Sequence, residues 1–487
     1  MIDRYKDLDI NKIWSDKNKL FLWLRTEMAV MHARLHFKDE ISWEDYERIK
    51  RSLEENPIDI EWWKTKDKEI HHDLNAFIQE RIRFMPKELR KYFHQGMTSY
   101  DTEEPAFVKM IKDSIKIVER HYFELEKIIK EMAMKYRYTI MNGRTHGQEA
   151  EMQSFGKRCL TWLQDLRISF RNLRKSKENL RFSKLSGAIG NYGGVTPAIE
   201  TKALKFLGFK PQYGATQIMP RELYAPIAQG LSQIVATINK IALTIRLGAR
   251  SGRPIYQEPF AKKQTGSSAM PHKKNTISTE QMEGMYRMAK AYAMAIMENI
   301  QTWEERAIEQ SCVERVCWPD LFHVTIRVLK VMKRVLGGLV VYPNNMLQEI
   351  YESRGCYASS HAKEILKQLG FDFNEAYRIV QLAAFNVFES AREERFPKSF
   401  DDADKLITMD LNVFYKKLVS IKEIISEGNS KVSLQLSATK EEVQNWNNKL
   451  REVFQHSENL ELWSKIFLPS YLLRNEDTLY RRILRIT

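Results

Sequence analysis

The sequence IAQGLSQIVATINKIALTI, residues 227–245, places apolar side chains at steps of three and four residues. Steps of this size put the side chains on one face of an α-helix. We therefore predict a long amphipathic helix over 218–247, and helices of this length usually belong to a bundle. The apolar face consists of Ile227, Leu231, Ile234, Val235, Ile238, Ile241, Ala242 and Ile245.

Two other stretches repeat this spacing, one over 108–132 and one over 282–300. Segments with strand-like alternation are scarce, and Gly, Pro and Asn cluster between the periodic stretches. The sequence predicts an all-α fold with three mostly helical domains and a long central bundle. The domains are residues 1–110, 111–345 with a loop at 262–276, and 346–487 with an extension beyond about residue 395.

Composition limits the class of protein. A chain of 487 residues with 43% hydrophobic and 29% charged residues is typical of a globular protein that buries a sizeable core. The charged N-terminus and the lack of a run of 18 uncharged apolar residues predict neither a secretory signal nor a membrane span. Free thiols in a reducing cytoplasm are expected, because no metal-ligand spacing connects Cys159, Cys312, Cys317 and Cys356.

The net charge of +14 has three possible explanations: nucleic acid, an anionic membrane surface or a polyanionic small substrate. Lys and Arg are spread along the chain among Asp and Glu, and no nucleic-acid-binding motif is present. We attribute most of the excess to a solvated surface and a smaller part to an anionic site.

The stretch TGSSAMPHKKN, residues 265–275, is the strongest sign of chemistry. Backbone amides of a Gly-Ser-Ser turn can hold an anion, and two lysines add positive charge. A bare Gly-Ser-Ser is more often a hinge loop with solvated lysines, but the whole string rarely arises by chance. The pattern Ser278-x-x-Gln281 predicts a capping box at the start of the following helix.

Several shorter motifs are weak one by one. Adjacent histidines are usually helix-face residues, hydroxyl-rich turns often only cap helices, and arginines nine residues apart are often surface cations. A histidine between glycines is different, because the backbone there can approach a ligand closely. The motifs are His71-His72-Asp73, His94–Asp101 with Thr98 and Ser99, Gly143-Arg-Thr145-His146-Gly147, Thr216-Gln217, Trp303–Arg306 and Ser311–Arg315.

Together and in order, these motifs resemble the fumarase/aspartase superfamily and, within it, the adenylosuccinate lyase family. Arg4-Tyr5, Tyr342–Met346 and Glu375–Gln381 extend the match, which covers roughly residues 1–395. The resemblance implies a C–N lyase that eliminates fumarate from adenylosuccinate to give AMP. It also implies the same reaction on the succinyl-carboxamide ribotide SAICAR to give AICAR, in purine nucleotide biosynthesis and without metal or cofactor.

The resemblance also implies roles for single residues. Ser267 is the base, His146 the acid that protonates the leaving nitrogen, and Glu280 the partner of His146. A serine hydroxyl is weakly acidic, so the loop amides and Lys273 must stabilise its alkoxide. His72 is expected at the reaction centre. The substrate-binding residues implied are Arg4, Tyr5, His71, Asp73, Thr98, Ser99, Thr145, Gln217, Ser268, Asn275, Arg306, Ser311 and Arg315.

Some positions depart from the family pattern. Thr276 stands where Pro is usual, Gln281 replaces a frequent Asn, and Glu149 stands where His is common, so Glu149 receives no role. Another lyase or cycloisomerase of the superfamily (carboxymuconate cycloisomerase, argininosuccinate lyase), or a non-catalytic structural relative, remains an alternative. Against these stand Arg4-Tyr5, His72-Asp73 and His272, together with the intact Ser267, His146 and Glu280. A nucleic-acid-binding role rests on charge alone, so neither nucleic acid nor a membrane is an expected partner.

Long helices such as 218–247 carry more apolar surface than one chain of this size readily covers. We therefore expect partner helices to complete the bundle. The resemblance adds a homotetramer, a tetrameric multi-helix core whose active sites are shared between subunits, with His146 and Ser267 from different chains. The segment 440–487 is expected to be a helical extension that packs on the core or forms an oligomer interface.

Overall fold

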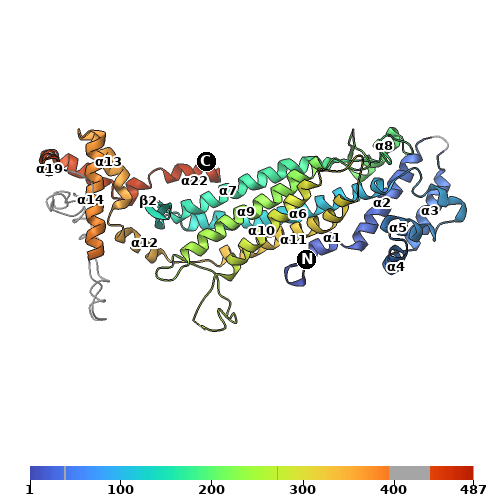
Figure 1. The fold of residues 1–487 in the computed structure, drawn as a ribbon, viewed down its shortest axis with the longest axis horizontal. Helices are drawn as coiled ribbons and strands as arrows, with labels where there is room; N and C mark the ends of the chain where they lie inside the picture. Colours follow the sequence, from blue (N-terminus) through green and yellow to red (C-terminus); the bar gives the residue numbers. More distant parts are fainter. Residues whose placement is uncertain (38–39, 271, 394–438, 486–487) are drawn as a thin grey trace. The chain divides into compact units, whose positions relative to one another are not determined.

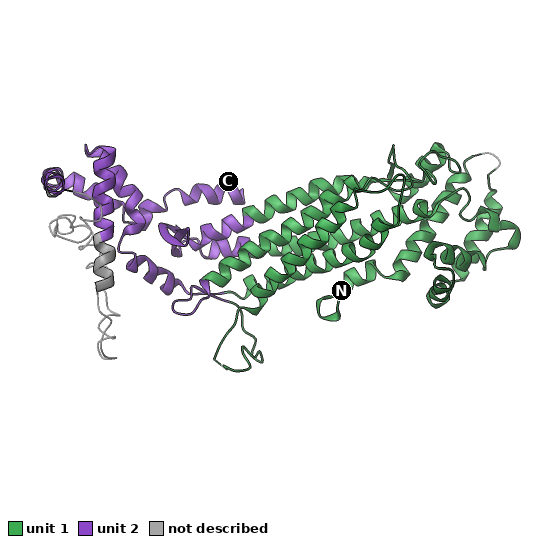
Figure 2. Ribbon diagram, viewed as in Figure 1, with its two compact units in different colours: residues 1–128, 164–247, 258–339 green, residues 129–163, 248–257, 340–487 purple. Residues whose placement is uncertain are grey.

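The computed structural model of the protein describes residues 1–37, 40–270, 272–393 and 439–485. The chain divides into two compact units, coloured green and purple in Figure 2. Unit 1 consists of residues 1–128, 164–247 and 258–339, and unit 2 of residues 129–163, 248–257 and 340–487. The division into three consecutive domains stays a prediction.

Long helices form the body of unit 1 and lie side by side in Figure 1. The predicted apolar faces of α6 and α9 are buried, that of α10 is buried in part, and the all-α expectation is confirmed. Neighbouring helices are also joined by polar pairs, including Arg167–Glu126, Ser169–Thr237 and Arg246–Glu283. The helices are α6 (Ser99–Lys135), α7 (Phe155–Ser176), α9 (Ala225–Gly248), α10 (Ile277–Glu298) and α11 (Glu309–Gly337), and α6 and α7 continue into unit 2.

Helix α9 begins later than the predicted residue 218. Residues 221–223 instead form a short 3-10 turn before the helix starts at Ala225. Pro226 lies in the first turn of α9, where its missing N–H costs nothing, but a proline farther inside the helix would break it. This explains the later start.

Shorter helices precede the bundle in unit 1. They pack around a core that includes Leu20, Trp23, Met31, Phe77 and Leu89. The helices are α1 (Leu8–Ile13), α2 (Asp16–Arg34), α3 (Trp43–Glu55), α4 (Ile60–Ile70) and α5 (Asp73–Ile82), with 3-10 turns at Asp3–Tyr5 and Lys87–Tyr92. Helix α8 (Pro197–Leu207) follows α7 in the chain and packs on α2.

The strands of the described residues are short and form three two-stranded pairs. The hairpin of β1 (Ile140–Thr145) and β2 (Gln148–Ser154) is antiparallel, with Thr145 opposite Gln148. The other pairs are β3 (Phe182–Ser183) with β4 (Lys210–Pro211), and β5 (Tyr256–Gln257) with β6 (Val340–Val341). No sheet in the described part of the chain is large enough to change the all-α class.

Unit 2 has its own core, to which the C-terminal segment contributes. Trp446, Leu450, Phe454 and Trp463 from this segment are buried in one cluster with residues such as Leu366. The described part of the predicted extension therefore packs within unit 2. Its helices are α12 (Pro343–Glu352), α13 (Ser359–Gln368), α14 (Phe373–Glu393), α19 (Lys440–Val453), α20 (Ser457–Lys465), α21 (Pro469–Leu472) and α22 (Glu476–Leu484).

The start of α10 corrects one prediction. Ser278 lies inside the first turn of α10 and is not its N-cap, so the Ser278-x-x-Gln281 capping box is wrong. The buried Glu258 carboxylate takes that role, because it accepts the N–H groups of Ser278 at 3.1 Å and Thr279 at 2.7 Å. The cap comes from a residue about 20 positions upstream, which a local sequence pattern does not contain.

Two further sequence expectations can be compared with the described residues. None of the helices in that part of the chain is both long and apolar enough to cross a membrane. All four cysteines are free, with Cys159 and Cys317 buried.

Candidate active site

A cavity of about 460 Å³ lies within unit 1, between helices α2, α4, α6 and α11. Three of the predicted binding residues, Asp73, Ser311 and Arg315, line it. Its wall combines tryptophans with charged side chains, a combination typical of small-molecule sites. The other lining residues are Trp14, Asp16, Lys19, Trp23, Trp63, Lys64, Asp67, Lys68, Tyr100, Glu103, Glu104, Phe107, Met110, Arg221, Glu314 and Pro319.

The His71-His72-Asp73 motif forms the junction between α4 and α5. His71 ends α4 in the left-handed conformation at φ 52°, and exposed His72 is the N-cap of α5. The His72 Nδ1 accepts the Asn75 N–H at 3.2 Å, so the neutral ring carries its hydrogen on Nε2. That N–H is left available as a donor at the helix start.

Asp73 is fixed in the first turn of α5. The Trp63 indole N–H donates to its carbonyl oxygen at 2.9 Å, and Asp73 Oδ2 lies 2.9 Å from Arg315 Nη2. Lys19 Nζ lies 3.9 Å from the same carboxylate oxygen. The lysine also sits near the faces of Trp23 and Trp63, at 5.1 and 4.8 Å from the ring centroids. Asp73 is therefore held beside two cations at the cavity wall.

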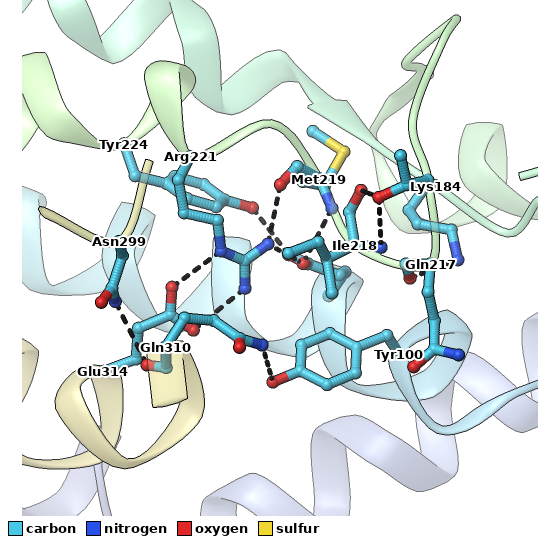
Figure 3. Close-up of polar contacts among 12 residues, drawn as sticks. Tyr100, Lys184, Gln217, Ile218, Met219, Arg221, Tyr224, Asn299, Gln310 and Glu314 are labelled. Atoms are coloured by element: carbon cyan, nitrogen blue, oxygen red, sulfur yellow. Dashed lines mark hydrogen bonds and ion pairs between the residues drawn. The ribbon is translucent and has the colours of Figure 1, made fainter. Parts of the chain in front are cut away.

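Tyr100 connects several predicted residues that lie far apart in the sequence. The Arg306 guanidinium lies 4.5 Å from the centroid of the Tyr100 ring, and Arg306 Nη1 donates to Gln217 Oε1 at 2.9 Å. Gln310 Nε2 donates to the Tyr100 hydroxyl at 3.1 Å (Figure 3). Gln217 also donates to the Ala188 carbonyl, so its carboxamide orientation is fixed. No sequence motif assigns Tyr100 a role.

Thr98 and Ser99 are placed by the start of α6. The Asp101 carboxylate accepts the Thr98 N–H at 2.9 Å, and Ser99 is the first residue of the helix. Buried Lys184 pairs with Asp101 at 2.8 Å and donates to the Gln217 carbonyl at 2.8 Å. Thr98 and Gln217, predicted from separate motifs, are thus connected through one buried ion pair.

A buried charged network lies beneath these residues (Figure 3). Arg221 donates to Glu314 through two nitrogens, at 2.9 and 3.0 Å, and its third nitrogen contacts Glu104 at 2.5 Å. Tyr224 donates to Glu104 at 2.8 Å. Removing one partner would leave a buried charge unpaired. The network therefore fixes the arrangement of three parts of the chain, which are α6, α11 and the segment that precedes α9.

The sequence interpretation missed these supporting residues for an identifiable reason. Asp101, Glu103 and Glu104 lie in the first turns of α6, where acidic residues are common for their favourable interaction with the helix dipole. Arg221 follows Gln217 by four residues, and this spacing is not specific by itself. The available signal for these supporting residues was the group of three acidic residues just before the apolar face of α6.

The signature loop 265–275 is partly exposed in unit 1, where Pro271 lies outside the described residues. The Ser267 Oγ accepts the N–H groups of Ala269 at 3.3 Å and Met270 at 3.1 Å. Asn275 Nδ2 donates to the Gly266 carbonyl at 3.0 Å. A Cβ on Gly266 would lie 2.0 Å from the Lys273 carbonyl oxygen, so only glycine permits this loop closure.

The remaining loop residues face outward. Ser268 and Lys273 are exposed, and exposed Glu280, in the first turn of α10, is within 3.4 Å of the Thr276 hydroxyl. The amide groups at Ser267 and the nearby Lys273 make this loop suited to negative charge.

His146 and Thr145 belong to unit 2. His146 and Gly147 form the turn of the β1–β2 hairpin at φ 53° and 78°, and both Thr145 and His146 are exposed. The base of β1 is held on α12, where Asn142 Nδ2 donates to the Glu349 carbonyl at 3.1 Å and Arg144 pairs with the Glu349 carboxylate at 3.1 Å. The histidine is therefore presented at the tip of an anchored hairpin.

Arg4 and Tyr5 lie in the 3-10 turn Asp3–Tyr5 of unit 1. The Arg327 guanidinium lies 4.7 Å from the Tyr5 ring centroid, and Arg327 also donates to the Arg4 carbonyl at 3.4 Å. The Arg4 side chain is exposed, and no residue that the structure describes pairs with it. Thus unit 1 brings together Asp73, Ser311, Arg315, Arg306 and Gln217. The hydrogen bonds of Ser267 and Asn275 to described residues stay within the loop.

The fold matches solved structures of lyases and related enzymes. A fumarate lyase from Mesorhizobium sp. BNC1 has a TM-score of 0.73 at 18% identity, covering 96% of this chain and 99% of that one. The β-carboxy-cis,cis-muconate cycloisomerase from Acinetobacter calcoaceticus has a TM-score of 0.69 at 18% identity, covering 92% and 98%. At this identity the likeness concerns the fold alone. The family described as Lyase matches residues 10–289, which defines the class of protein.

Sequence relatives narrow this class. Adenylosuccinate lyase from Aquifex aeolicus is 35% identical over 390 residues, 80% of this chain and 89% of that protein. The enzyme of the same name from Thermotoga maritima is 34% identical over 418 residues, 84% and 94% of the two chains. The chain belongs to the adenylosuccinate lyase family and is a C–N lyase. The family resemblance stated from the motifs is confirmed, and the cycloisomerase and argininosuccinate lyase alternatives are not favoured.

Proposed function

We propose that the chain cleaves adenylosuccinate into AMP and fumarate by β-elimination, and SAICAR into AICAR and fumarate, in purine nucleotide biosynthesis. The observation that supports this most is the cluster around Tyr100. Arg315 and Ser311 line the cavity, and Arg306 lies over the ring of Tyr100, which also lines it. The two guanidinium groups and the hydroxyl form a donor set suited to a nucleotide phosphate. The names of the 32–35% identical relatives point to the same substrate.

The bond changes can be assigned to side chains. Ser267 removes a proton from the succinyl β-carbon, the bond from the α-carbon to the purine 6-amino nitrogen breaks, and His146 protonates that nitrogen. The N–H groups of Ala269 and Met270, directed at Ser267 Oγ, would stabilise its alkoxide. Lys273 and Asn275 meet the negative charge that develops on the succinyl group, and Glu280 orients His146.

The binding residues surround these groups. Arg4, Tyr5, Arg306, Ser311 and Arg315 hold the AMP part. His71, His72 and Asp73 lie near the nucleotide and the reaction centre, and His72 donates through Nε2. Thr98, Ser99, Thr145, Gln217 and Ser268 contact the succinyl carboxylates.

We keep the homotetramer with shared sites as part of the proposal, together with a cytoplasmic location. The support is the apolar surface of unit 1. Leu243 and Leu247 on α9 and Met294 on α10 are 49%, 54% and 51% exposed. Side chains of this kind suit burial against helices of further copies.

The test is an absorbance assay of the purified protein with adenylosuccinate in EDTA, in which AMP and fumarate are both quantified. Equal amounts of both products are expected, because each elimination releases one AMP and one fumarate. Turnover should persist in EDTA, because the proposed base and acid are side chains. SAICAR is assayed in parallel. Absence of turnover with adenylosuccinate would overturn the proposal, and activity lost with EDTA and restored by a divalent ion would overturn its metal-free form.

A further inference from the structure

Glu103 lies on the face of α6 that lines the cavity. It is four residues after Ser99 and three after Tyr100, so it shares a helix face with both. Its side chain is partly exposed, and it lines the cavity together with Asp73, Ser311 and Arg315. Family resemblance and sequence pattern give it no role.

Glu103 carries a carboxyl group without a partner. Among the residues that the structure describes, none forms a hydrogen bond or an ion pair with it, although Asp73 and Glu104 nearby are both paired. Burial, followed by the charge of Asp73, raises the pKa of Glu103 to about 8 despite Arg315, Arg306 and Lys19. A desolvated carboxyl group without a hydrogen-bond partner costs free energy, and Glu103 lies where a bound ligand can supply that partner.

The surrounding charges indicate the kind of donor that is missing. Lys19 and Arg315 pair with Asp73, and the guanidinium of Arg306 is close enough to influence Glu103. With a pKa of about 8, the carboxyl group of Glu103 is mostly protonated at neutral pH and needs no further cation. Neutral hydroxyl groups suit it, because one hydroxyl of a vicinal diol can donate to its carbonyl oxygen while the other accepts its O–H.

We propose that Glu103 binds the ribose hydroxyl groups of the nucleotide and makes the enzyme selective for ribonucleotides over 2′-deoxyribonucleotides. This rests on the proposed function, since a phosphate at Ser311 and Arg315, which line the cavity, places the sugar next to it in the same cavity. When one hydroxyl is absent, one polar atom of the Glu103 carboxyl group stays in the cavity without a partner, and sites of this type reject the analogue strongly.

The experiment compares kcat/KM for adenylosuccinate and 2′-deoxyadenylosuccinate. For the wild type we expect a preference for the ribose form on the order of 10–100-fold. In Glu103→Ala the preference should fall to within about threefold, because the ribose substrate alone loses an interaction. Glu103→Gln, which keeps one acceptor oxygen and the size of the side chain, should lie between the two.

Asp67→Asn is the matched control. Asp67 is another acidic residue of the cavity wall, on α4 beside Lys64 and Lys68, and its replacement alters the charge of the same wall. It should leave the preference for ribose unchanged. If Asp67→Asn removes the preference as Glu103→Ala does, the effect is one of general charge and the proposal is wrong.

Calorimetry with AMP and 2′-deoxy-AMP supplies a measurement that needs no turnover. The wild type should bind AMP more tightly by a factor similar to its kinetic preference. A wild type that turns over adenylosuccinate yet treats both sugars alike overturns the role of Glu103 and leaves the proposed function intact. A wild type that turns over neither substrate refutes the proposed function itself, and AMP binding then shows separately whether Glu103 distinguishes the sugars.

Discussion

Tyr100 shows how single residues give the site its form. The Tyr100 ring contacts the Arg306 guanidinium, and the Tyr100 hydroxyl accepts a hydrogen bond from Gln310. Groups from α6, from α11 and from the segment before α11 therefore meet at one side chain. Sequence reasoning found the ligand-facing candidates, such as Arg306 and Gln217, because they belong to motifs. It did not find Tyr100, Lys184 or Glu104, because their partners lie far away in the chain and are brought near only by folding.

Ser267→Ala tests the proposed base. Turnover should fall about 10²–10⁴-fold. The free energy of unfolding should change by less than about 1 kcal/mol, because Ser267 lies on a partly exposed loop and loses only two local hydrogen bonds. Ser268→Ala serves as the neighbouring control and should mainly raise KM. Near-normal kcat in Ser267→Ala would remove this residue as the base.

Arg315→Ala tests the proposed phosphate contact. AMP affinity should weaken by about 1.5–3 kcal/mol, the size typical of a hydrogen bond to a charged group. Arg306→Ala should behave similarly. Exposed Arg287 on α10, which pairs with Glu283, provides a control substitution to alanine with no expected effect. Isothermal calorimetry measures all three, and unchanged affinity in both site variants would place the phosphate elsewhere.

His94 gives a pH dependence of stability. Burial lowers the pKa of His94, but the hydrogen bond and charge of Glu27 outweigh it, so this pKa lies above 6.5 in the folded protein. The His94 Nδ1 and Glu27 Oε1 are 2.8 Å apart. The protonated pair therefore stabilises the fold fully below about pH 6.5, and this contribution is lost as pH rises through the raised pKa.

The corresponding variant is His94→Gln. Its loss of stability relative to the wild type should be larger at pH 6 than at pH 9, measured as the denaturant midpoint. His456→Gln, at an exposed position, should show no such difference between the two pH values. An equal loss for His94→Gln at both pH values would contradict the protonated pair.

Among elements, helix interiors were predictable and their boundaries were not. The apolar spacing of α6 and α9 requires only local sequence, and the buried faces follow it, whereas in α10 Met282, Ala289 and Ile296 are buried but Met288 is exposed. Helix α9 starts at Ala225 and not at the predicted residue 218. The start of α10 is capped by Glu258, which precedes the signature loop in the sequence. Boundaries such as these are decided by tertiary contacts, which a pattern of neighbouring residues does not encode.

Glu258→Ala tests this cap. The substitution leaves the N–H groups of Ser278 and Thr279 without their acceptor in a buried place, which should destabilise the protein by about 1–3 kcal/mol. Thr276→Ala is the comparison: Thr276 occupies the N-cap position of α10, but its side chain caps no backbone N–H. It should cost less than about 0.5 kcal/mol. Equal losses in thermal or chemical unfolding would show that Glu258 is not the principal cap.

At the scale of the molecule, the proposed acid and base belong to different compact units. His146 lies at a hairpin tip in unit 2, and Ser267 in an exposed loop of unit 1. His146 is exposed and Ser267 is half-buried, and among the described residues neither has a hydrogen bond to another predicted catalytic residue of its own unit. A single sequence indicates which residues carry chemistry, but it does not indicate which copy of the chain supplies each one.

The proposed shared site has a direct test by mixing inactive chains. His146→Ala and Ser267→Ala, each nearly inactive alone, are combined in equal amounts and reassembled. If the histidine and the serine of one site come from different subunits, about one quarter of the sites receive both intact residues. Fumarate release should then recover to roughly that share of wild-type activity, with each variant reassembled alone as the control. Mixed tetramers verified by mass that stay inactive would contradict sharing of these two residues. A sedimentation profile with monomer alone at assay concentration would refute the tetramer, because a monomer has no partner from which to receive the missing side chain.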